Sequence, residues 1–501
     1  MLANRRFIRA AYFFYLKFAL QNAKLFFSEK SGSFTRNREL QKLIAKALAS
    51  LEGSKMVSKS IRSLARNPIV LSVALCLALA SPAAAAVPGV QKFDGADTAW
   101  LLLSSALVLM MTIPGLALFY GGMVRRKNVL STLMQSFILV GIVSIQWVLF
   151  GYSLAFAPGN ALVGALSWAG LSGVSASQPY AAYSATVPHQ AFMIYQCMFA
   201  VITPALITGA IAERMSFKGF LVFSILWITL IYDPLAHWVW GVDGWIHQMG
   251  ALDFAGGTVV HISSGVAALA AALMVGKRRG YPHEPMQPHN LTLTVTGAGL
   301  LWVGWFGFNA GSSLAANGLA VSAFVATHLG ASAAALSWVA AEWWIGGKPT
   351  VLGAASGAVA GLVAITPASG YVGPVPAIII GGIAGVLCYS ACRMKSRFGY
   401  DDALDVVGVH AVGGIWGALA TGLFASALVN AAGADGLFNG NPRQLLIQAT
   451  AVVATIAFSF IGSTILLKVT DALVGLRVVD EAEQAGLDLS EHEEAAYAFE
   501  A

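Results

Sequence analysis

Charged residues are scarce in this chain: Asp, Glu, Lys and Arg make up 11% of its 501 residues, against about 25% in soluble domains. Hydrophobic residues account for 57%. This composition argues against a soluble fold and is typical of an integral membrane protein. The length allows about ten or more spans of ~20 residues each, and the 52 glycines would let membrane helices approach closely. We therefore predict a single all-α bundle in the membrane.

Cysteine is also rare, and its positions indicate no chemistry. Of the four cysteines, Cys76 lies in an N-terminal apolar segment, Cys197 stands alone, and Cys388 and Cys392 are one turn apart on an apolar stretch. Neither a disulfide framework nor a metal-ligand spacing is present, so buried thiols are expected. Since a nucleophile, a metal set and a cofactor motif are all missing, we expect no metal, no cofactor and no enzymatic activity.

The basic charge of the chain is confined to its N-terminal segment. Residues 1–86 carry 14 of the 30 Lys and Arg residues but only three of the 24 Asp and Glu residues, so the rest of the chain is net acidic. A nucleic-acid partner, which the overall charge of +6 would suggest, is therefore not expected.

Residues 56–86 have the form of a secretory signal peptide. "MVSKSIRSLARN" is a basic region, "PIVLSVALCLALA" is an apolar core too short to span, and "SPAAAAVPG" ends near Ala86 with small residues. Because such signals begin proteins, we predict Met56 to be the initiator and residues 1–55 an upstream extension. The alternative is that residues 1–55 form a genuine N-terminal amphipathic segment.

Eleven apolar runs, separated by polar or Gly/Pro breaks, predict eleven transmembrane helices in a membrane domain spanning residues 87–471. Residues 472–501 would form a C-terminal tail. The predicted spans are 97–122, 129–157, 188–212, 218–241, 253–276, 288–312, 319–345, 350–368, 373–394, 406–429 and 443–471.

Basic residues divide unevenly between the loops. Twelve of them fall in alternate loops: Arg125, Arg126, Lys127, Arg214, Lys218, Lys277, Arg278, Arg279, Lys348, Arg393, Lys395 and Arg397. The intervening loops carry Arg443, and the N-terminal stub carries Lys92. The positive-inside rule makes the richer side cytoplasmic. The mature N-terminus is then outside and the C-terminus inside a cell (inner) membrane, which agrees with a signal peptide.

Two histidine motifs suggest an internal repeat. Val260-His261-x-x-x-Gly265 in the fifth span matches Val409-His410-x-x-x-Gly414 in the tenth, and an aspartate stands eight residues before each histidine, Asp253 and Asp402. Because spans one to five and six to ten cross in opposite senses, we predict inverted five-helix repeats plus an eleventh helix. Inverted repeats place substrate sites near the membrane midplane. Chance similarity between glycine-rich helices is the alternative.

The paired spacing predicts where the histidines lie. Eight residues of helix span about 12 Å, so His261 and His410 would enter from opposite faces and meet near the centre. They would line a path, since polar groups at that depth are usually functional, although a lone histidine can simply join two helices. For Asp402 we favour a helix-capping role. For Asp253, capping and attraction of a cation are both open.

Aromatic residues mark the predicted outer entrance. Trp240 ends the fourth span, Phe199 lies in the outer half of the third, and Phe308 and Ser312 are one turn apart at the end of the sixth. Interfacial aromatics usually anchor a protein in the bilayer. An indole beside a carboxylate and a hydroxyl would also suit a small cation. Asp233 precedes a proline in the fourth span, and we assign it no function.

Five stretches together resemble the Amt/Mep/Rh ammonium transporters, on the bacterial Amt side. They are "TIPGLALFYGGMVRRKNVLS", "AERMSF", "ALDFAGGTVVHI", "WFGFNAGS" and "DVVGVHAVGGIWG", and the resemblance runs in order from about residue 94 to 500. It implies a homotrimer of eleven-helix protomers, each with its own pore. The tail resembles a cytoplasmic segment that couples protomers and can contact PII-type regulators.

The same resemblance assigns roles to individual residues. Trp240, Phe199 and Ser312, supported by Asp253, match an external recruitment site for ammonium. Phe199 and Phe308 match a stacked gate, and His261 and His410 match the twin pore histidines.

We therefore predict an ammonium transporter, with methylammonium as an analogue substrate. Moving an intact ion through a hydrocarbon-lined pore is costly, so ammonium would lose its proton and cross as ammonia past the histidines. The resemblance favours net transport of NH3 plus H+. The alternatives are an ammonium sensor acting through a PII-type partner and, far less favoured, a membrane enzyme using the histidines as acid and base.

Overall fold

The computed structural model describes residues 93–497 of the chain. The predicted extension at residues 1–55 and the predicted signal peptide at residues 56–86 lie outside the described residues. Within residues 93–497, every regular element is helical apart from two isolated β-bridges. The prediction of an all-α membrane protein is confirmed.

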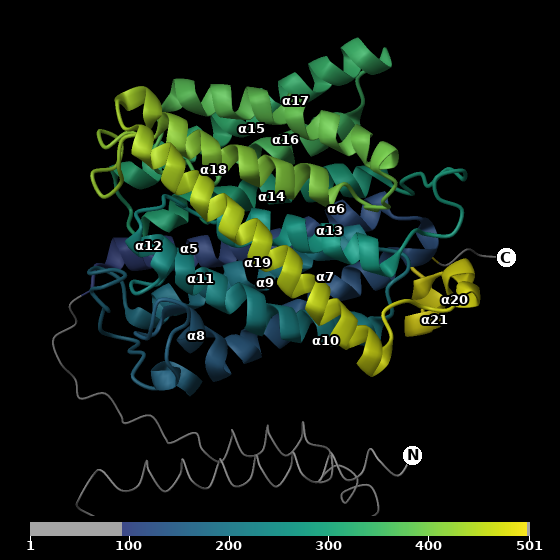
Figure 1. The fold of residues 1–501 in the computed structure, drawn as a ribbon, viewed down its shortest axis with the longest axis horizontal. Helices are drawn as coiled ribbons and strands as arrows, with labels where there is room; N and C mark the ends of the chain where they lie inside the picture. Colours follow the sequence, from purple (N-terminus) through teal and green to yellow (C-terminus); the bar gives the residue numbers. More distant parts are fainter. Residues whose placement is uncertain (1–92, 498–501) are drawn as a thin grey trace, which may run out of the picture. The chain divides into compact units, whose positions relative to one another are not determined.

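The apolar helices follow the predicted spans closely (Figure 1). Among the described residues, ten helical stretches are long and apolar enough to cross a membrane. The remaining predicted span, the eighth at 350–368, is the 15-residue helix α16, which at about 1.5 Å per residue is shorter than the ~30 Å hydrocarbon core. The main helices are α5 (Gly95–Met110), α6 (Ala117–Met123), α7 (Val129–Gln146), α8 (Tyr152–Phe156), α9 (His189–Ile211), α10 (Phe217–Trp227), α11 (Asp233–Trp240), α13 (Ser263–Val275), α14 (Leu291–Ala310), α15 (Gly318–Gly346), α16 (Val351–Ile365), α17 (Pro374–Phe398), α18 (Val412–Phe424) and α19 (Pro442–Val474).

Shorter elements interrupt or connect these helices. The π-helical turns are η1 (Met111–Leu116), η3 (Trp147–Gly151), η5 (Ile228–Tyr232), η6 (Gly257–Ile262) and η8 (Val407–Ala411). The 3₁₀ turns are η2 (Arg126–Asn128), η4 (Leu166–Leu171), η7 (Gly311–Ser313) and η9 (Leu437–Asn439), and the remaining short helices are α12 (Trp245–Gln248), α20 (Asp480–Ala485) and α21 (Leu487–His492).

Several of the helices begin at a side-chain cap. The Asp94 carboxylate accepts the backbone N–H groups of Ala96 and Asp97 at the start of α5, and Asn317 accepts two at the start of α15. Such caps satisfy N–H groups that have no partner within the helix. α15 ends where Gly347 adopts a left-handed conformation (φ 82°), which glycine tolerates without steric cost.

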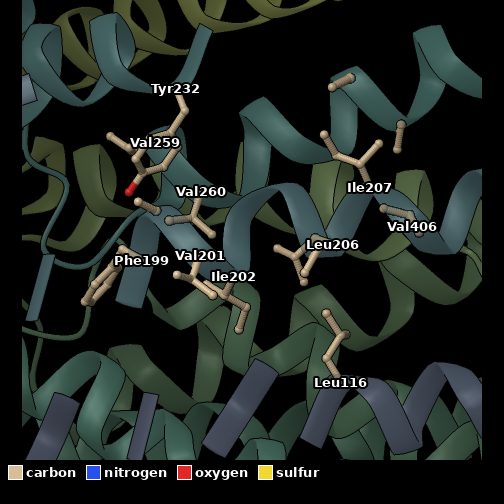
Figure 2. Packing of buried hydrophobic residues seen from close by; sticks show 14 of the residues in the cluster. Leu116, Phe199, Val201, Ile202, Leu206, Ile207, Tyr232, Val259, Val260 and Val406 are labelled. Carbon is tan, nitrogen blue, oxygen red and sulfur yellow. The ribbon is translucent and has the colours of Figure 1, made fainter. Parts of the chain in front are cut away.

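Close packing in the interior depends on small residues. A Cβ on Gly381 of α17 would lie 2.0 Å from the carbonyl oxygen of Gly330 on α15, so neither helix could approach the other with larger residues there. α19 runs obliquely across the other helices (Figure 1) and packs against α10, α13 and α18. Figure 2 shows part of the buried apolar interior, where α9 carries Phe199, Ile202 and Leu206.

The two ends of the bundle differ in chemistry. We call the end where α11 stops at Trp240 and η6 starts after Asp253 the aromatic end. The other end, where α9 stops before Glu213 and α13 stops before Arg278, is called the basic end. Here Glu213 accepts from the Arg125 guanidinium at 2.8 Å and from Arg278 at 3.3 Å. Arg278 also donates to Asp401 at 2.8 Å.

These buried carboxylates of the basic end remain ionised because cations surround them. Burial alone would raise the pKa of Glu213, but the Arg278 and Arg125 guanidinium groups hold it below its ordinary value. The pKa of Asp401 is lowered against the same effect of burial by its hydrogen bonds to Arg278. An ion pair of this kind is costly to break, because removing one partner leaves an uncompensated buried charge.

The tail folds back onto the basic end. Leu487 donates its backbone N–H to Asn128 at 2.8 Å, and the Asp488 carboxylate accepts from the backbone N–H of Ser131 at 2.9 Å. Lys127 donates to the carbonyl oxygens of Glu483 and Gln484. Figure 1 shows α20 and α21 beside this end of the bundle.

Candidate functional site

The two predicted histidines lie in equivalent backbone settings. His261 belongs to η6, which leads into α13, and His410 belongs to η8, which leads into α18. Both turns are π-helical, a rare geometry that is frequent at functional sites. Each therefore stands about one turn inside a helix that begins within the membrane domain.

Asp253 holds the start of η6. Its carboxylate accepts the backbone N–H groups of Gly256, Gly257 and Thr258, each at 2.7 Å, and also the Thr258 hydroxyl. This geometry matches the capping interpretation, because a carboxylate suits the positive end of a helix. Asp253 also lines the cavity of the aromatic end, described below.

Asp402 caps the start of η8 with fewer hydrogen bonds than Asp253 makes at η6. One of its carboxylate oxygens accepts the Val407 N–H at 2.7 Å, and the other, Oδ1, has no hydrogen-bond partner among the described residues. Burial raises the pKa of Asp402 to about 6, against the opposing charge of Lys395. The capping role predicted for Asp402 agrees with this geometry.

The glycines that follow the histidines bring the two motifs together. A Cβ on Gly265 would lie 2.2 Å from the backbone nitrogen of Ala411. A Cβ on Gly414 would lie 3.1 Å from the Cβ of His261. Each glycine therefore packs against the other motif at its histidine. This reciprocal contact is the arrangement expected of a two-fold-related repeat.

The imidazoles meet in the centre. His261 Nδ1 and His410 Nδ1 are 3.3 Å apart, and the rings are stacked at 27° with centroids 5.4 Å apart. Because two ring nitrogens can share only one hydrogen between them, one Nδ1 donates and the other accepts. His261 Nε2 is buried and has no partner among the described residues.

A cavity of about 550 Å³ opens at the aromatic end. Phe199, Trp240, Asp253 and Ser312, the four predicted recruitment residues, all line it. The Trp240 indole N–H donates to the carbonyl oxygen of Asp253 at 2.9 Å, and the ring meets Phe199 edge to face with centroids 5.8 Å apart. This contact presents the indole with its nitrogen already bound to protein.

Two phenylalanines close this cavity on its inner side. The rings of Phe199 and Phe308 have centroids 4.3 Å apart and planes tilted by 36°, slightly closer than the ~4.5–7 Å usual for aromatic pairs. Phe199 lines the cavity of the aromatic end, and Phe308 lines a second, smaller cavity beyond it. The ring pair therefore separates the two spaces.

The smaller cavity holds about 10 Å³, close to the ~10–15 Å³ needed for one water-sized molecule. Its lining comes from seven elements: Met111, Leu116, Phe119, Ile202, Leu206, Val260, His261, Leu301, Trp305, Phe308, Val359 and His410. Figure 2 shows Leu116, Ile202, Leu206 and Val260 from this wall. Apart from the histidines, these side chains are apolar or aromatic.

The sequence did not identify every residue at the site. Trp305 stacks on His261 with ring centroids 5.5 Å apart and donates its indole N–H to Thr366 at 2.8 Å. Its position one turn before Phe308 was the available signal. Tyr195, one turn before Phe199, was also not identified. Asp233 is fully buried, and one of its oxygens accepts from Gln146 at 2.7 Å.

The arrangement can bind and sort a small molecule by its charge. The aromatic cavity offers π faces and a hydroxyl, which suit a cation, whereas the smaller cavity offers almost no group that could replace the water around an ion. A molecule that changes from charged to neutral between the two spaces could pass, with a nitrogen acceptor at His261.

Comparison with known proteins identifies a family with similar sequences. Residues 99–497 match the family described as Ammonium Transporter Family. The chain is 55% identical over 402 residues to the ammonium transporter of Bacillus subtilis, covering 80% of this chain and 98% of the relative.

Solved structures of other proteins have a similar fold. The crystal structure of Candida albicans Mep2 superposes with a TM-score of 0.73 at 36% identity, covering 78% of this chain and 88% of Mep2. A structure described as Sensor Amt Protein has a TM-score of 0.72 at 28% identity, covering 79% of this chain and 98% of that one. With its family match across the membrane domain and these close relatives, the chain belongs to the ammonium transporter family.

Proposed function

We propose that this protein transports ammonium across a cell membrane, binding the ion at the aromatic end and passing ammonia through the smaller cavity. The observation that carries the proposal is the succession of two spaces of opposite character. A cation-binding cavity is followed by an apolar one, and a pair of phenylalanine rings stands between them. Neither space alone distinguishes ammonium from other small solutes.

Ammonium is recruited by Trp240, Phe199 and Ser312. A π face over a desolvated cation contributes roughly 0.5–2 kcal/mol, and the Ser312 oxygen adds an acceptor for one N–H. The Asp253 carboxylate supports the site indirectly, since its oxygens are engaged by backbone N–H groups. Its negative charge nonetheless favours a cation in the cavity.

The proton leaves ammonium at the Phe199/Phe308 gate. An N–H bond breaks, its electron pair stays on nitrogen, and neutral ammonia enters the smaller cavity. His261 Nε2 is a buried nitrogen without a partner among residues 93–497, and it accepts the proton when His261 Nδ1 carries the shared hydrogen. The doubly protonated His261 then releases the hydrogen of its Nδ1 across the 3.3 Å contact to His410 Nδ1, so one ammonia and one proton cross together as net ammonium.

Potassium is excluded by the same step. It has no proton to release, and the apolar wall cannot replace its hydration shell. Selectivity therefore comes from chemistry at the gate as well as from the diameter of the path.

His261→Ala tests the proposal most directly. In liposomes, ammonium should evoke a current through the unaltered protein, and His261→Ala should abolish that current or remove selectivity over potassium. His328→Ala is the matched control, since His328 also lies on a membrane helix but is exposed and lines neither cavity. Rapid ammonia flux without current would instead indicate a passive ammonia channel.

The topology and assembly belong to the same proposal. Twelve basic residues at the basic end make that end cytoplasmic by the positive-inside rule, with the mature N-terminus outside the inner membrane. By family resemblance the protein is a homotrimer, and a PII-type regulator binds at the cytoplasmic face beside the tail. Cysteine labelling of loop positions from either side of the membrane measures the orientation.

A sensing role is the second candidate, favoured by the similarity to a structure described as Sensor Amt Protein. The docked tail would report occupancy of the pore to a PII-type partner. Methylammonium uptake by a transporter-deficient host separates the two: membrane-inserted protein that takes up none favours the sensor.

A further inference from the structure

Tyr195 makes an unusual set of contacts behind the wall of the aromatic cavity. It lies on α9 one turn before Phe199, is fully buried and lines neither cavity. Its hydroxyl oxygen lies 2.9 Å from the Gly307 carbonyl oxygen, 2.8 Å from that of Phe308, and 3.1 Å from Ser312 Oγ. One side chain of α9 therefore holds the end of α14 and the start of η7.

The helix end explains why the tyrosine hydroxyl donates there. Gly307 and Phe308 lie in the last turn of α14, where the Gly307 carbonyl oxygen already accepts the backbone N–H of Gly311. A carbonyl oxygen has two lone pairs and can accept a second hydrogen bond. A phenol has one hydrogen, which these carbonyls attract. The Tyr195 oxygen then keeps its lone pairs, and one of them faces Ser312.

The hydrogen of Ser312 consequently has two acceptors inside the protein. The Phe308 carbonyl oxygen is 2.9 Å from Ser312 Oγ, and the Tyr195 oxygen is 3.1 Å away. With its hydrogen directed into the wall, Ser312 presents a lone pair to the cavity that it lines. Ammonium has only N–H donors, so it needs an acceptor at this position and would be repelled by a donor.

We propose that Tyr195 is a positioning residue for ammonium recruitment: its hydroxyl holds Ser312 as a hydrogen-bond acceptor towards the cavity and fixes Phe308 relative to Phe199. The ring adds to this link, since Tyr195 meets Phe199 edge to face with centroids 5.0 Å apart. The inference rests on the proposed function and adds to it a residue that never contacts the ion.

Gly311 gives the hydroxyl its place. A Cβ on Gly311 would lie 2.7 Å from both the Tyr195 hydroxyl oxygen and the Cβ of Ser104, so a larger residue would push this turn away from both side chains and disturb the contact between the hydroxyl and Ser312. The contact of Tyr195 with Ser312 and the end of α14 therefore requires a glycine at position 311.

Tyr195→Phe tests the proposal, because it removes the hydroxyl and keeps the ring. In liposomes, the ammonium concentration giving half-maximal current should rise about 3- to 10-fold, the range expected for one lost hydrogen bond. The maximal current, corrected for inserted protein, should change less than about 2-fold, because the rings and histidines remain in place. Tyr120→Phe is the matched control: Tyr120 is equally buried, and its hydroxyl donates to Leu206 away from Ser312.

A double-mutant cycle with Ser312→Ala identifies the partner. If Tyr195 acts through Ser312, Tyr195→Phe should raise the half-maximal concentration in the native background and add little in the Ser312→Ala background. Equal increases in both backgrounds, or none in either, would overturn the proposal. Gly311→Ala is a second variant that leaves Tyr195 intact, and it should shift the half-maximal concentration in the same direction.

The cycle also separates this inference from the proposed function. If the unaltered protein carries no ammonium current, or if Ser312→Ala and Trp240→Leu leave the half-maximal concentration unchanged, the recruitment site itself is wrong. If those two variants raise it while Tyr195→Phe does not, only the positioning role is wrong.

Discussion

At the aromatic end of the bundle, side chains leave a cavity of about 550 Å³, whereas at the basic end charged side chains and the tail contact one another closely. The carboxylates also differ. Asp253 is bound mainly by backbone N–H groups of its own turn, while Glu213 and Asp401 are bound by arginines from other segments. At the aromatic end, the Asp253 carboxylate caps the start of a helix beside a cavity. At the basic end, ion pairs connect loops that are distant in sequence.

This difference between the two ends predicts which property a substitution at each end should alter. Removing one partner of a buried ion pair strongly destabilises the fold, because the other charge is left unpaired in a poorly solvated place. In the proposed recruitment site, by comparison, the π faces, the hydroxyl and the carboxylate would each contribute a modest and separate share of the binding free energy. Substitutions should therefore affect stability at the basic end and apparent affinity at the aromatic end.

The largest expected effect comes from Glu213→Ala. Arg278 and Arg125 would lose a buried counter-charge, which should cost about 3–5 kcal/mol of stability. Thermal unfolding of detergent-solubilised protein, followed by intrinsic fluorescence, measures the loss. Glu481→Ala is the control, because Glu481 is exposed, and a comparable loss in that variant would contradict the explanation.

The next effect should depend on pH. The pKa of Asp402 is raised to about 6 by burial, above the ~3.9 of an unfolded aspartate. The folded state therefore retains a proton that the unfolded state has lost. The resulting stabilisation is complete below about pH 4 and is lost as the pH rises through about 6.

Asp402→Asn should remove this dependence. At pH 8 the variant should be more stable than the unaltered protein by up to about 3 kcal/mol, at ~1.4 kcal/mol per pKa unit. At pH 4 the two should be nearly equal, because the folded carboxyl is neutral and the unfolded one is still about half protonated. Unfolding temperatures measured from pH 4 to 8 test the expectation, and parallel curves for the two proteins would refute it.

A smaller effect, on apparent affinity alone, is expected from Trp240→Leu. Loss of the indole face should weaken ammonium recruitment by about 0.5–2 kcal/mol, or roughly 2- to 30-fold in the half-maximal concentration, with little change in unfolding temperature. Trp343→Leu is the matched control, because Trp343 is exposed and lies outside both cavities. A large fall in stability for Trp240→Leu would break the contrast between the two ends.

Much of the fold was predictable because membrane spans have a simple physical signature. Long apolar runs interrupted by charge identify helices without knowledge of their neighbours. The predicted starts lie within four residues of the observed ones, and at the short helix α16 within one residue. What failed to appear in the apolar pattern was the interruption of helices by π turns. Two of those turns, η6 and η8, carry the histidines and lie close to Gly265 and Gly414, which pack against the opposite motif.

The sequence predicted which residues line the aromatic cavity, but it did not predict which side chains contact one another there. Trp240, Phe199, Ser312 and Asp253 carried signals of residue type and position, and the structure brings them to one cavity. Tyr195 carried none, because an aromatic residue on a membrane helix usually indicates packing. Its importance rests on three oxygen atoms that lie far from it in sequence, at Gly307, Phe308 and Ser312.

By itself, the sequence determined that this chain is a bundle of apolar helices, and it predicted two histidines at matching depth. That follows from local composition and from the Asp-x7-His spacing. Only the tertiary structure decided that the imidazoles meet at 3.3 Å, that two phenyl rings divide the path, and that the basic end is held by ion pairs. Local sequence sets which groups favour lipid or water, whereas distances between groups on different helices depend on the packing of the whole bundle.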